Sequence, residues 1–139
     1  MRRQDKYPDT ATFHFHNENP KGKYAGDCVV RAIAQALNQS WEQTYRELTE
    51  VGIRLGCLID EIGCYDSYLT SKGWIKCKQE RKPNGKKYTG IEFCDKIAQK
   101  DKVYIIHIGT GHISVVVDKK VNDTWDCTGG CVGNYWIKA

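Results

Sequence analysis

The chain has 139 residues, of which 40% are hydrophobic and 27% are charged, and this predicts one soluble domain with one core. Thirteen glycines and three prolines exclude collagen-like or low-complexity sequence, and the longest apolar stretch, Val103–Ile108, is too short for a membrane helix. The net charge is +4, yet residues 72–87 alone carry seven basic side chains against one acidic one. This local patch differs from the basic surface of a domain that binds nucleic acid as a whole.

The first residues are charged, but no apolar run follows them, so we expect no secretory signal and a cytoplasmic protein. In that reducing compartment the seven cysteines should be free thiols. No C-x-x-C pair occurs, which argues against a zinc ribbon or a thioredoxin-type site, and the three-residue gap between Cys127 and Cys131 fits no strong zinc pattern. The sequence therefore predicts no metal and no cofactor.

The predicted elements begin with an N-terminal arm, residues 1–16, which is poorly ordered or forms a short strand over 12–16. Asp27 is a typical N-cap, and Cys28–Leu37 follows with apolar residues at helical spacing. Because little in this helix is polar, we expect it to lie at the centre of the domain.

Capping and turn patterns mark the middle of the chain. Ser40 and Thr89 each begin a capping box, and Gly56 and Gly73 are suited to end helices. They predict helices over 41–55, 60–72 and 90–99, a strand over 74–78 and a turn at 83–85.

The pattern then changes to strands. Val103–Ile108 and His112–Val117 form a predicted hairpin around a Gly-Thr-Gly turn. A turn at 119–123 and short strands at 124–127 and 134–138 complete the chain. Helices followed by an antiparallel sheet predict a single α+β domain over residues 1–139.

Cys28 is the first candidate for chemistry. A helix N-terminus carries free N–H groups and about half a positive charge, and both stabilise a thiolate. The Cys28 N–H could also bind an oxyanion, and Gly26 would let a substrate approach closely. Alone, however, a cysteine on an apolar helix is more often a core residue.

His112 and Asp126 are the second and third candidates. His112 begins a strand beside a glycine-rich turn, where its ring can be exposed, and Asp126 lies on the next predicted strand. Asp126 could therefore accept the second N–H of His112, as the orienting carboxylate of a nucleophile–base–orienter site does, and Trp125 could shield that bond. His107, five residues away, is the competing histidine, but it shares a face with Val103 and Ile105, which favours packing.

Three segments, Gly26–Ile33, Gly111–Val116 and Trp125-Asp126, resemble papain-like cysteine peptidases, most closely the small bacterial branch that includes bacteriocin-processing peptidases. The resemblance spans about residues 17–138. It implies a papain-like fold and hydrolysis of a peptide or protein substrate through a thioester. By position, Cys28 would be the nucleophile, His112 the general base and then acid, and Asp126 the orienter.

One position departs from this family. A glutamine that helps to bind the oxyanion usually stands six residues before the cysteine, where this chain has Gly22. Asn19 is the candidate replacement, with the Cys28 N–H as the second donor. The same thioester chemistry would also serve deamidation or acyl transfer.

The alternative function is a non-enzymatic binding module. In that case the basic 72–87 segment would contact an acidic protein or nucleic acid, with Trp74 and Tyr88 as stacking rings. Such a run is otherwise most often a solvated surface.

Overall fold

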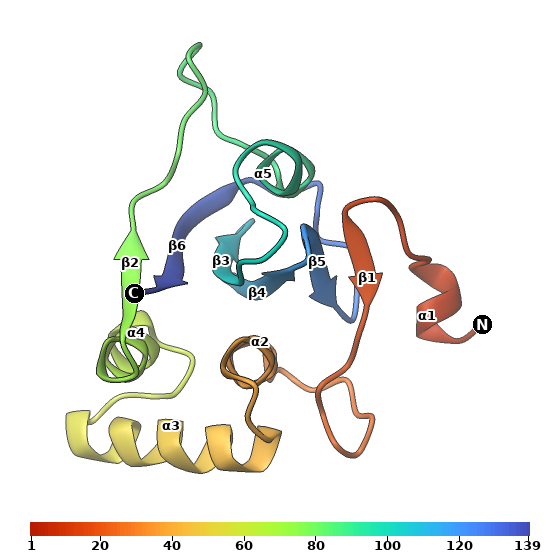
Figure 1. Cartoon of the computed structure of the whole chain (residues 1–139). Coiled ribbons are helices and arrows are strands. Elements are labelled where there is room, and N and C mark those ends of the chain that lie inside the picture. The colour runs from red at the N-terminus through yellow and green to blue at the C-terminus, as the bar shows by residue number, and fades with distance from the viewer.

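The computed structural model describes residues 1–139 and has three layers (Figure 1). A six-stranded sheet forms the middle layer, with the short helix α5 on one face and α2, α3 and α4 on the other. The helices are α1 (Arg3–Lys6), α2 (Cys28–Leu37), α3 (Trp41–Leu55), α4 (Ile62–Ser71) and α5 (Gly90–Lys96). The strands are β1 (Phe13–Phe15), β2 (Trp74–Cys77), β3 (Tyr104–Ile108), β4 (His112–Val117), β5 (Lys120–Asp123) and β6 (Val132–Lys138).

The sheet has the order β1-β5-β4-β3-β6-β2. Four of its pairings are antiparallel, but β1 runs parallel to β5, with Phe13 opposite Val121. The predicted α+β class is confirmed, whereas the prediction of a purely antiparallel, C-terminal sheet is wrong. The two strands that come first in the chain, β1 and β2, form the two edges of the sheet.

Two apolar clusters hold the layers together. The larger lies between the sheet and α2–α4 and includes the fully buried Ile33, Leu48, Leu69 and Trp136. The smaller lies between the sheet and α5, where the ring of Phe93 packs against Tyr104 and Tyr135. Since α2 contributes most of its residues to the larger cluster, it is the central helix that the sequence predicts. No helix of the structure is long and apolar enough to cross a membrane.

Local chemistry explains the helix ends. The Ser40 side chain accepts a hydrogen bond from the Gln43 N–H at the start of α3, and Gly56 ends this helix in the left-handed conformation. Thr89 and Glu92 form the reciprocal capping box at the start of α5. The predicted stop at Gly73 is also confirmed, with φ at +84° between α4 and β2. α5, however, ends at Lys96, three residues earlier than expected.

The structure corrects the predictions around residue 120. Residues 120–123 form strand β5, not a turn, and residues 124–127 form no strand. The turn between β4 and β5 contains only Asp118 and Lys119, both at positive φ, and Val117 pairs directly with Lys120. This tight two-residue turn shifts β5 toward the N-terminus and makes Asp123 its last residue.

Candidate active site

Cys28 is the first residue of α2, and the segment before it is firmly held. Asp27 occupies the N-cap position, as predicted, but its side chain makes no capping hydrogen bond. The buried Asp27 carboxylate instead accepts hydrogen bonds from Arg31 Nε at 2.8 Å, Trp41 Nε1 at 3.0 Å and Asn19 Nδ2 at 3.1 Å. As the first residue of a helix, Cys28 has no intrahelical acceptor for its backbone N–H, so this N–H can bind an anion.

His112 begins β4, where it lies opposite Ile108 of β3. Its Nε2 lies 2.7 Å from the Oδ2 atom of Asp123, and only 15% of its side chain is exposed. The Trp125 ring lies over it, with 5.1 Å between the ring centroids. Because Nε2 is bound to the carboxylate, Nδ1 is the ring nitrogen left for proton exchange.

Asp123, not Asp126, is the carboxylate that orients His112. Besides His112, Asp123 accepts hydrogen bonds from Ser114 Oγ at 2.6 Å, the Thr124 N–H at 2.7 Å and Arg31 at 2.9 Å. The Cys127 thiol is a weaker donor to it at 3.7 Å. Asp123 is only 2% exposed, so these donors replace the water that a carboxylate would otherwise bind.

The expected contact between Asp126 and His112 is therefore wrong. The Asp126 carboxylate accepts hydrogen bonds from the Thr128 N–H at 3.0 Å and from Thr128 Oγ1 at 2.5 Å. This is a local turn contact, which follows from the absence of the strand expected over residues 124–127. The pairing of β4 with β5 instead places Asp123 beside Ser114 and His112.

His112 affects the acidity of Cys28, while the pairing of the two as nucleophile and base stays a prediction. Burial raises the pKa of the Cys28 thiol. Hydrogen bonding with His112 and with the Ile113 N–H, together with the positive charges of His112 and Arg31, lowers this pKa by more than burial raises it. The net result is a Cys28 pKa below the ordinary value for a thiol.

The pKa of His112 moves in the opposite direction. Burial lowers it, but hydrogen bonds with Asp123, Cys127 and Cys28 and the charge of Asp123 raise the pKa of His112 to about 11. These contacts favour the protonated form of His112, just as the contacts of Cys28 favour its thiolate.

Arg31 connects the two halves of the site, and the sequence analysis did not identify it. Its guanidinium donates to Asp27, directly before Cys28, and to Asp123, the partner of His112. Only 11% of the Arg31 side chain is exposed. One side chain thus joins the start of the helix to the end of β5. The four-residue spacing from Asp27 to Arg31 was the available clue, since it places both on one helix face.

Asn19 is buried beside this network. Its Nδ2 donates to Asp27, and its Oδ1 accepts a hydrogen bond from the Lys21 N–H at 2.9 Å. The structure therefore shows Asn19 supporting the loop before Cys28. Its oxyanion role stays a prediction.

His107, the competing histidine, lies elsewhere on the sheet. It lines a hollow with Cys131 and Asn134, and its Nδ1 is close to Gly133. His112, not His107, interacts with Cys28.

Three side chains could together hold a metal ion. The donor atoms of His112, Asp123 and Cys127 lie within 4.8 Å of one another. Arg31, however, places a positive charge 2.9 Å from the Asp123 carboxylate, which disfavours a second cation there. The donor set fits a hydrogen-bonded orienting group better than a metal centre.

Two hollows are lined by residues close in the chain to Cys28 and to His112, although neither is lined by Cys28 or His112 itself. The first, here called the apolar groove, has a volume of about 710 Å³ and is lined by Gly26, Tyr45, Ile53 and residues 56–61. The second, here called the β6 groove, has about 340 Å³ and is lined by Ile62, Lys87, Gly109 and residues 133–134. Gly26 lies two residues before Cys28, and Gly109 lies three residues before His112. Glu61 lines the apolar groove and Ile62, the next residue, lines the β6 groove, so the two grooves come close to each other at the start of α4.

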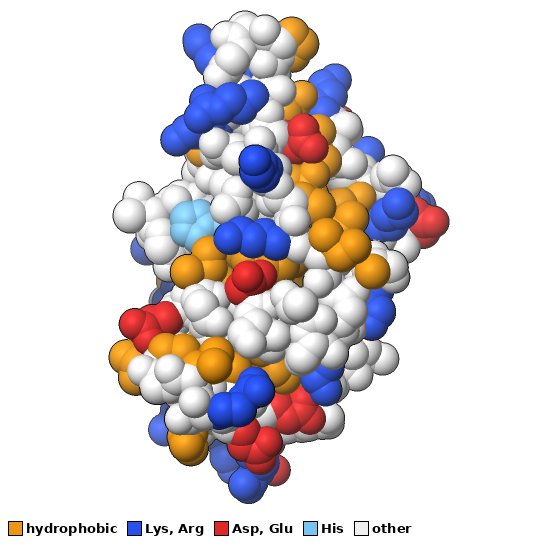
Figure 2. All heavy atoms as spheres, turned by 90° about the vertical axis from the view of Figure 1, so that its left-hand side faces the viewer, with side chains coloured by type: hydrophobic (Ala, Val, Ile, Leu, Met, Phe, Trp, Pro, Cys, Tyr) orange, Lys and Arg blue, Asp and Glu red, His pale blue; other side chains and the backbone are white.

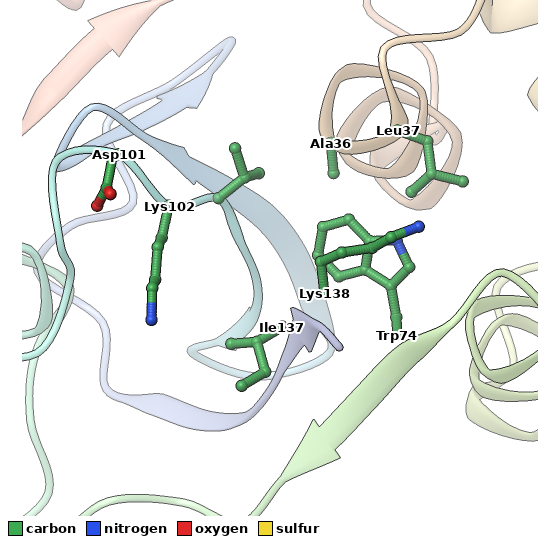
Figure 3. Close-up of a pocket in the computed structure, with 8 residues that line it drawn as sticks. Ala36, Leu37, Trp74, Asp101, Lys102, Ile137 and Lys138 are labelled. Atoms are coloured by element: carbon green, nitrogen blue, oxygen red, sulfur yellow. The ribbon is translucent and has the colours of Figure 1, made fainter.

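A third hollow, of about 450 Å³, lies at the other end of α2 (Figure 3). Ala36 and Leu37 of the last helical turn face it, together with Trp74 and Ile137. At about 1.5 Å of rise per residue, the helix separates this hollow from Cys28 by roughly 12 Å. It is therefore not part of the Cys28 site.

Comparisons with protein-family models, with curated proteins and with solved structures find no match.

Proposed function

We propose that the protein is a cysteine-dependent amide hydrolase, a peptidase that resembles the papain-like enzymes, with Cys28, His112 and Asp123 as its triad. The single observation that carries the proposal is the position of His112. Its ring binds the buried Asp123 carboxylate through Nε2, and His112 lowers the pKa of the Cys28 thiol at the start of α2. A nucleophile, a base and an orienting group in this order are the elements of covalent acyl transfer.

In the proposed reaction the Cys28 thiolate attacks the substrate carbonyl carbon, and the C=O bond becomes a tetrahedral oxyanion. The Cys28 N–H at the helix N-terminus stabilises that oxyanion. The His112 imidazolium gives its proton to the leaving amine as the C–N bond breaks, which forms a thioester on Cys28. His112 then takes a proton from water as the water oxygen attacks the thioester carbon. The C–S bond breaks, the carboxylic acid is released, and the Cys28 thiolate and His112 imidazolium are restored.

Asp123 acts throughout by holding the His112 ring in one tautomer and by stabilising its charged form. The proposed setting is the cytoplasm, where reducing conditions keep Cys28 a thiol, in keeping with seven cysteines that are all free in the structure. Deamidation or acyl transfer would use the same thioester and the same three residues.

The proposal is tested by alkylation with a limiting amount of iodoacetamide at neutral pH, followed by mass spectrometry of each cysteine. Cys131 is the internal reference, because it is an exposed thiol. We expect Cys28 to be labelled well ahead of Cys131, and His112→Ala to remove that advantage. His107→Ala is the matched control and should leave the labelling order unchanged. Preferential labelling of Cys131 in the unmodified protein would overturn the proposal.

A further inference from the structure

A long loop between β2 and α5 extends beyond the sheet (Figure 1). We call residues 78–88 of this loop the basic arm. Four of its cations, Lys78, Arg81, Lys86 and Lys87, are exposed and form no ion pair, whereas Lys82 is paired with Glu92. Figure 2 shows several Lys and Arg side chains and fewer acidic ones on the upper part of this face. Glu80 is the one acidic residue of the arm and accepts a hydrogen bond from Tyr135, so the arm carries a clear excess of positive charge.

The arm is also held in a defined shape. At its tip, Lys82 and Lys86 are joined by a backbone hydrogen bond of 2.8 Å, and Arg81 donates to the Gly85 carbonyl at 3.0 Å. The base of the arm is held to β6 by hydrogen bonds, among them one from the Gln79 side chain to the Val132 carbonyl. A surface that is ordered before binding loses less conformational entropy when a partner binds.

The base of the basic arm forms part of the β6 groove. Lys87 and Gln79, at the base of the arm, line the β6 groove, which reaches Gly109 in the turn before His112. A chain bound across Cys28 and continuing through this groove would run onto the arm. The apolar groove, which is lined by Gly26 two residues before Cys28, exposes Ile53 by 78% and Leu58 by 71%.

We propose that the substrate is a polypeptide with an acidic stretch on one side of the bond that is cut and apolar residues on the other side. The basic arm binds the acidic stretch, and the apolar groove binds the apolar residues. This inference rests on the proposed function, because it names the substrate of that same site. The opposite character of the two grooves would set the direction in which the chain is bound.

A polypeptide fits this surface better than nucleic acid. Trp74 is 5% exposed and Tyr88 is half-buried against the core, so neither ring is free to stack on a base. Asp60 and Glu61 line the apolar groove and would repel a polyanion that continued past Cys28. A peptide whose negative charge is confined to one half avoids that repulsion.

The test measures peptide binding to the full chain carrying Cys28→Ala, so that no reaction occurs. The probe is a fluorescent peptide with an apolar half and a Glu-rich half, and the comparison peptide has Gln in place of each Glu. The arm variant Lys78→Gln/Lys86→Gln/Lys87→Gln is matched by Lys6→Gln/Lys100→Gln/Lys102→Gln, which removes the same charge from exposed lysines outside the arm.

We expect the Glu-rich peptide to bind more tightly than the Gln-rich peptide, and the arm variant to weaken that binding about ten-fold. The control variant should change it less than about two-fold. Equal weakening by both variants, or equal binding of the two peptides, would overturn the inference. Tighter, arm-dependent binding of a DNA or RNA duplex would overturn it in favour of a nucleic-acid surface. Selective alkylation of Cys28 would survive either failure, which separates this inference from the proposed function.

Discussion

Arg31→Met is the substitution that most strongly perturbs the link between the two halves of the site. Arg31 makes two charge-assisted hydrogen bonds, at 2.8 Å to Asp27 and at 2.9 Å to Asp123, and both carboxylates are buried. Methionine keeps the apolar stem but removes the charge and both donors.

The expected loss of stability follows from those contacts. Breaking a buried ion pair by removing one partner typically costs about 3–5 kcal/mol. Here Asp27 keeps its contacts with Trp41 and Asn19, and Asp123 keeps four other donors, which offset part of that cost. We therefore expect the free energy of unfolding to fall by about 2–4 kcal/mol.

Urea unfolding measures the stability, and the pH dependence of Cys28 alkylation measures the site. Because the Arg31 charge lowers the pKa of Cys28, Arg31→Met should move that profile to higher pH. Arg31→Lys keeps the positive charge but cannot donate to both carboxylates in the same geometry. It should therefore bring the pH profile of Cys28 alkylation close to that of the unmodified protein, while the free energy of unfolding stays lower.

Arg46→Met is the matched control, because Arg46 makes only an exposed pair with Glu42, 3.7 Å away on α3. Its effect should lie within about 0.5 kcal/mol. If Arg31→Met behaves like Arg46→Met in both assays, Arg31 does not connect the helix to the orienting carboxylate.

Two further predictions concern Asp123. Asp123→Asn should slow alkylation of Cys28 at neutral pH, because the His112 imidazolium loses its carboxylate partner. Asp126→Asn should leave the alkylation rate unchanged. A slower rate in Asp126→Asn and an unchanged rate in Asp123→Asn would restore Asp126 as the orienter. Burial raises the pKa of Asp123, but the hydrogen bond and charge of His112, then Ser114 and Arg31, lower it from 3.8 to about 2. The stability that Asp123 contributes is therefore present above about pH 4 and lost as pH falls toward 2. Urea unfolding should show a steeper loss over that interval in the unmodified protein than in Asp123→Asn, and parallel curves would contradict this.

Parts of the fold and site that depend on local sequence were predictable. The start of α2 at Cys28 follows from Asp27 and the apolar spacing after it, and His112 follows from the glycine-rich turn between two β-branched segments. Both residues lie where the sequence places them because their surroundings are set within a few neighbouring positions.

Asp123 was missed because its place depends on strand register. The tight turn at Asp118 and Lys119 uses residues other than glycine at positive φ, so it leaves no strong turn pattern in the sequence. The parallel pairing of β1 with β5 joins segments more than a hundred residues apart, and no local pattern specifies such a contact. Arg31 was missed for the same reason, since one of its two carboxylate partners lies on β5.

The most direct test of the central claim is the rate of Cys28 alkylation as a function of pH, measured by mass spectrometry against Cys131 in the same molecule. A thiolate stabilised by His112 predicts that the Cys28 rate reaches its plateau at a lower pH than an ordinary thiol, which titrates near pH 8.5. His112→Ala should return the Cys28 profile to the ordinary range. A Cys28 profile in the unmodified protein that rises only around or above pH 8.5, and that His112→Ala leaves unchanged, would contradict the account.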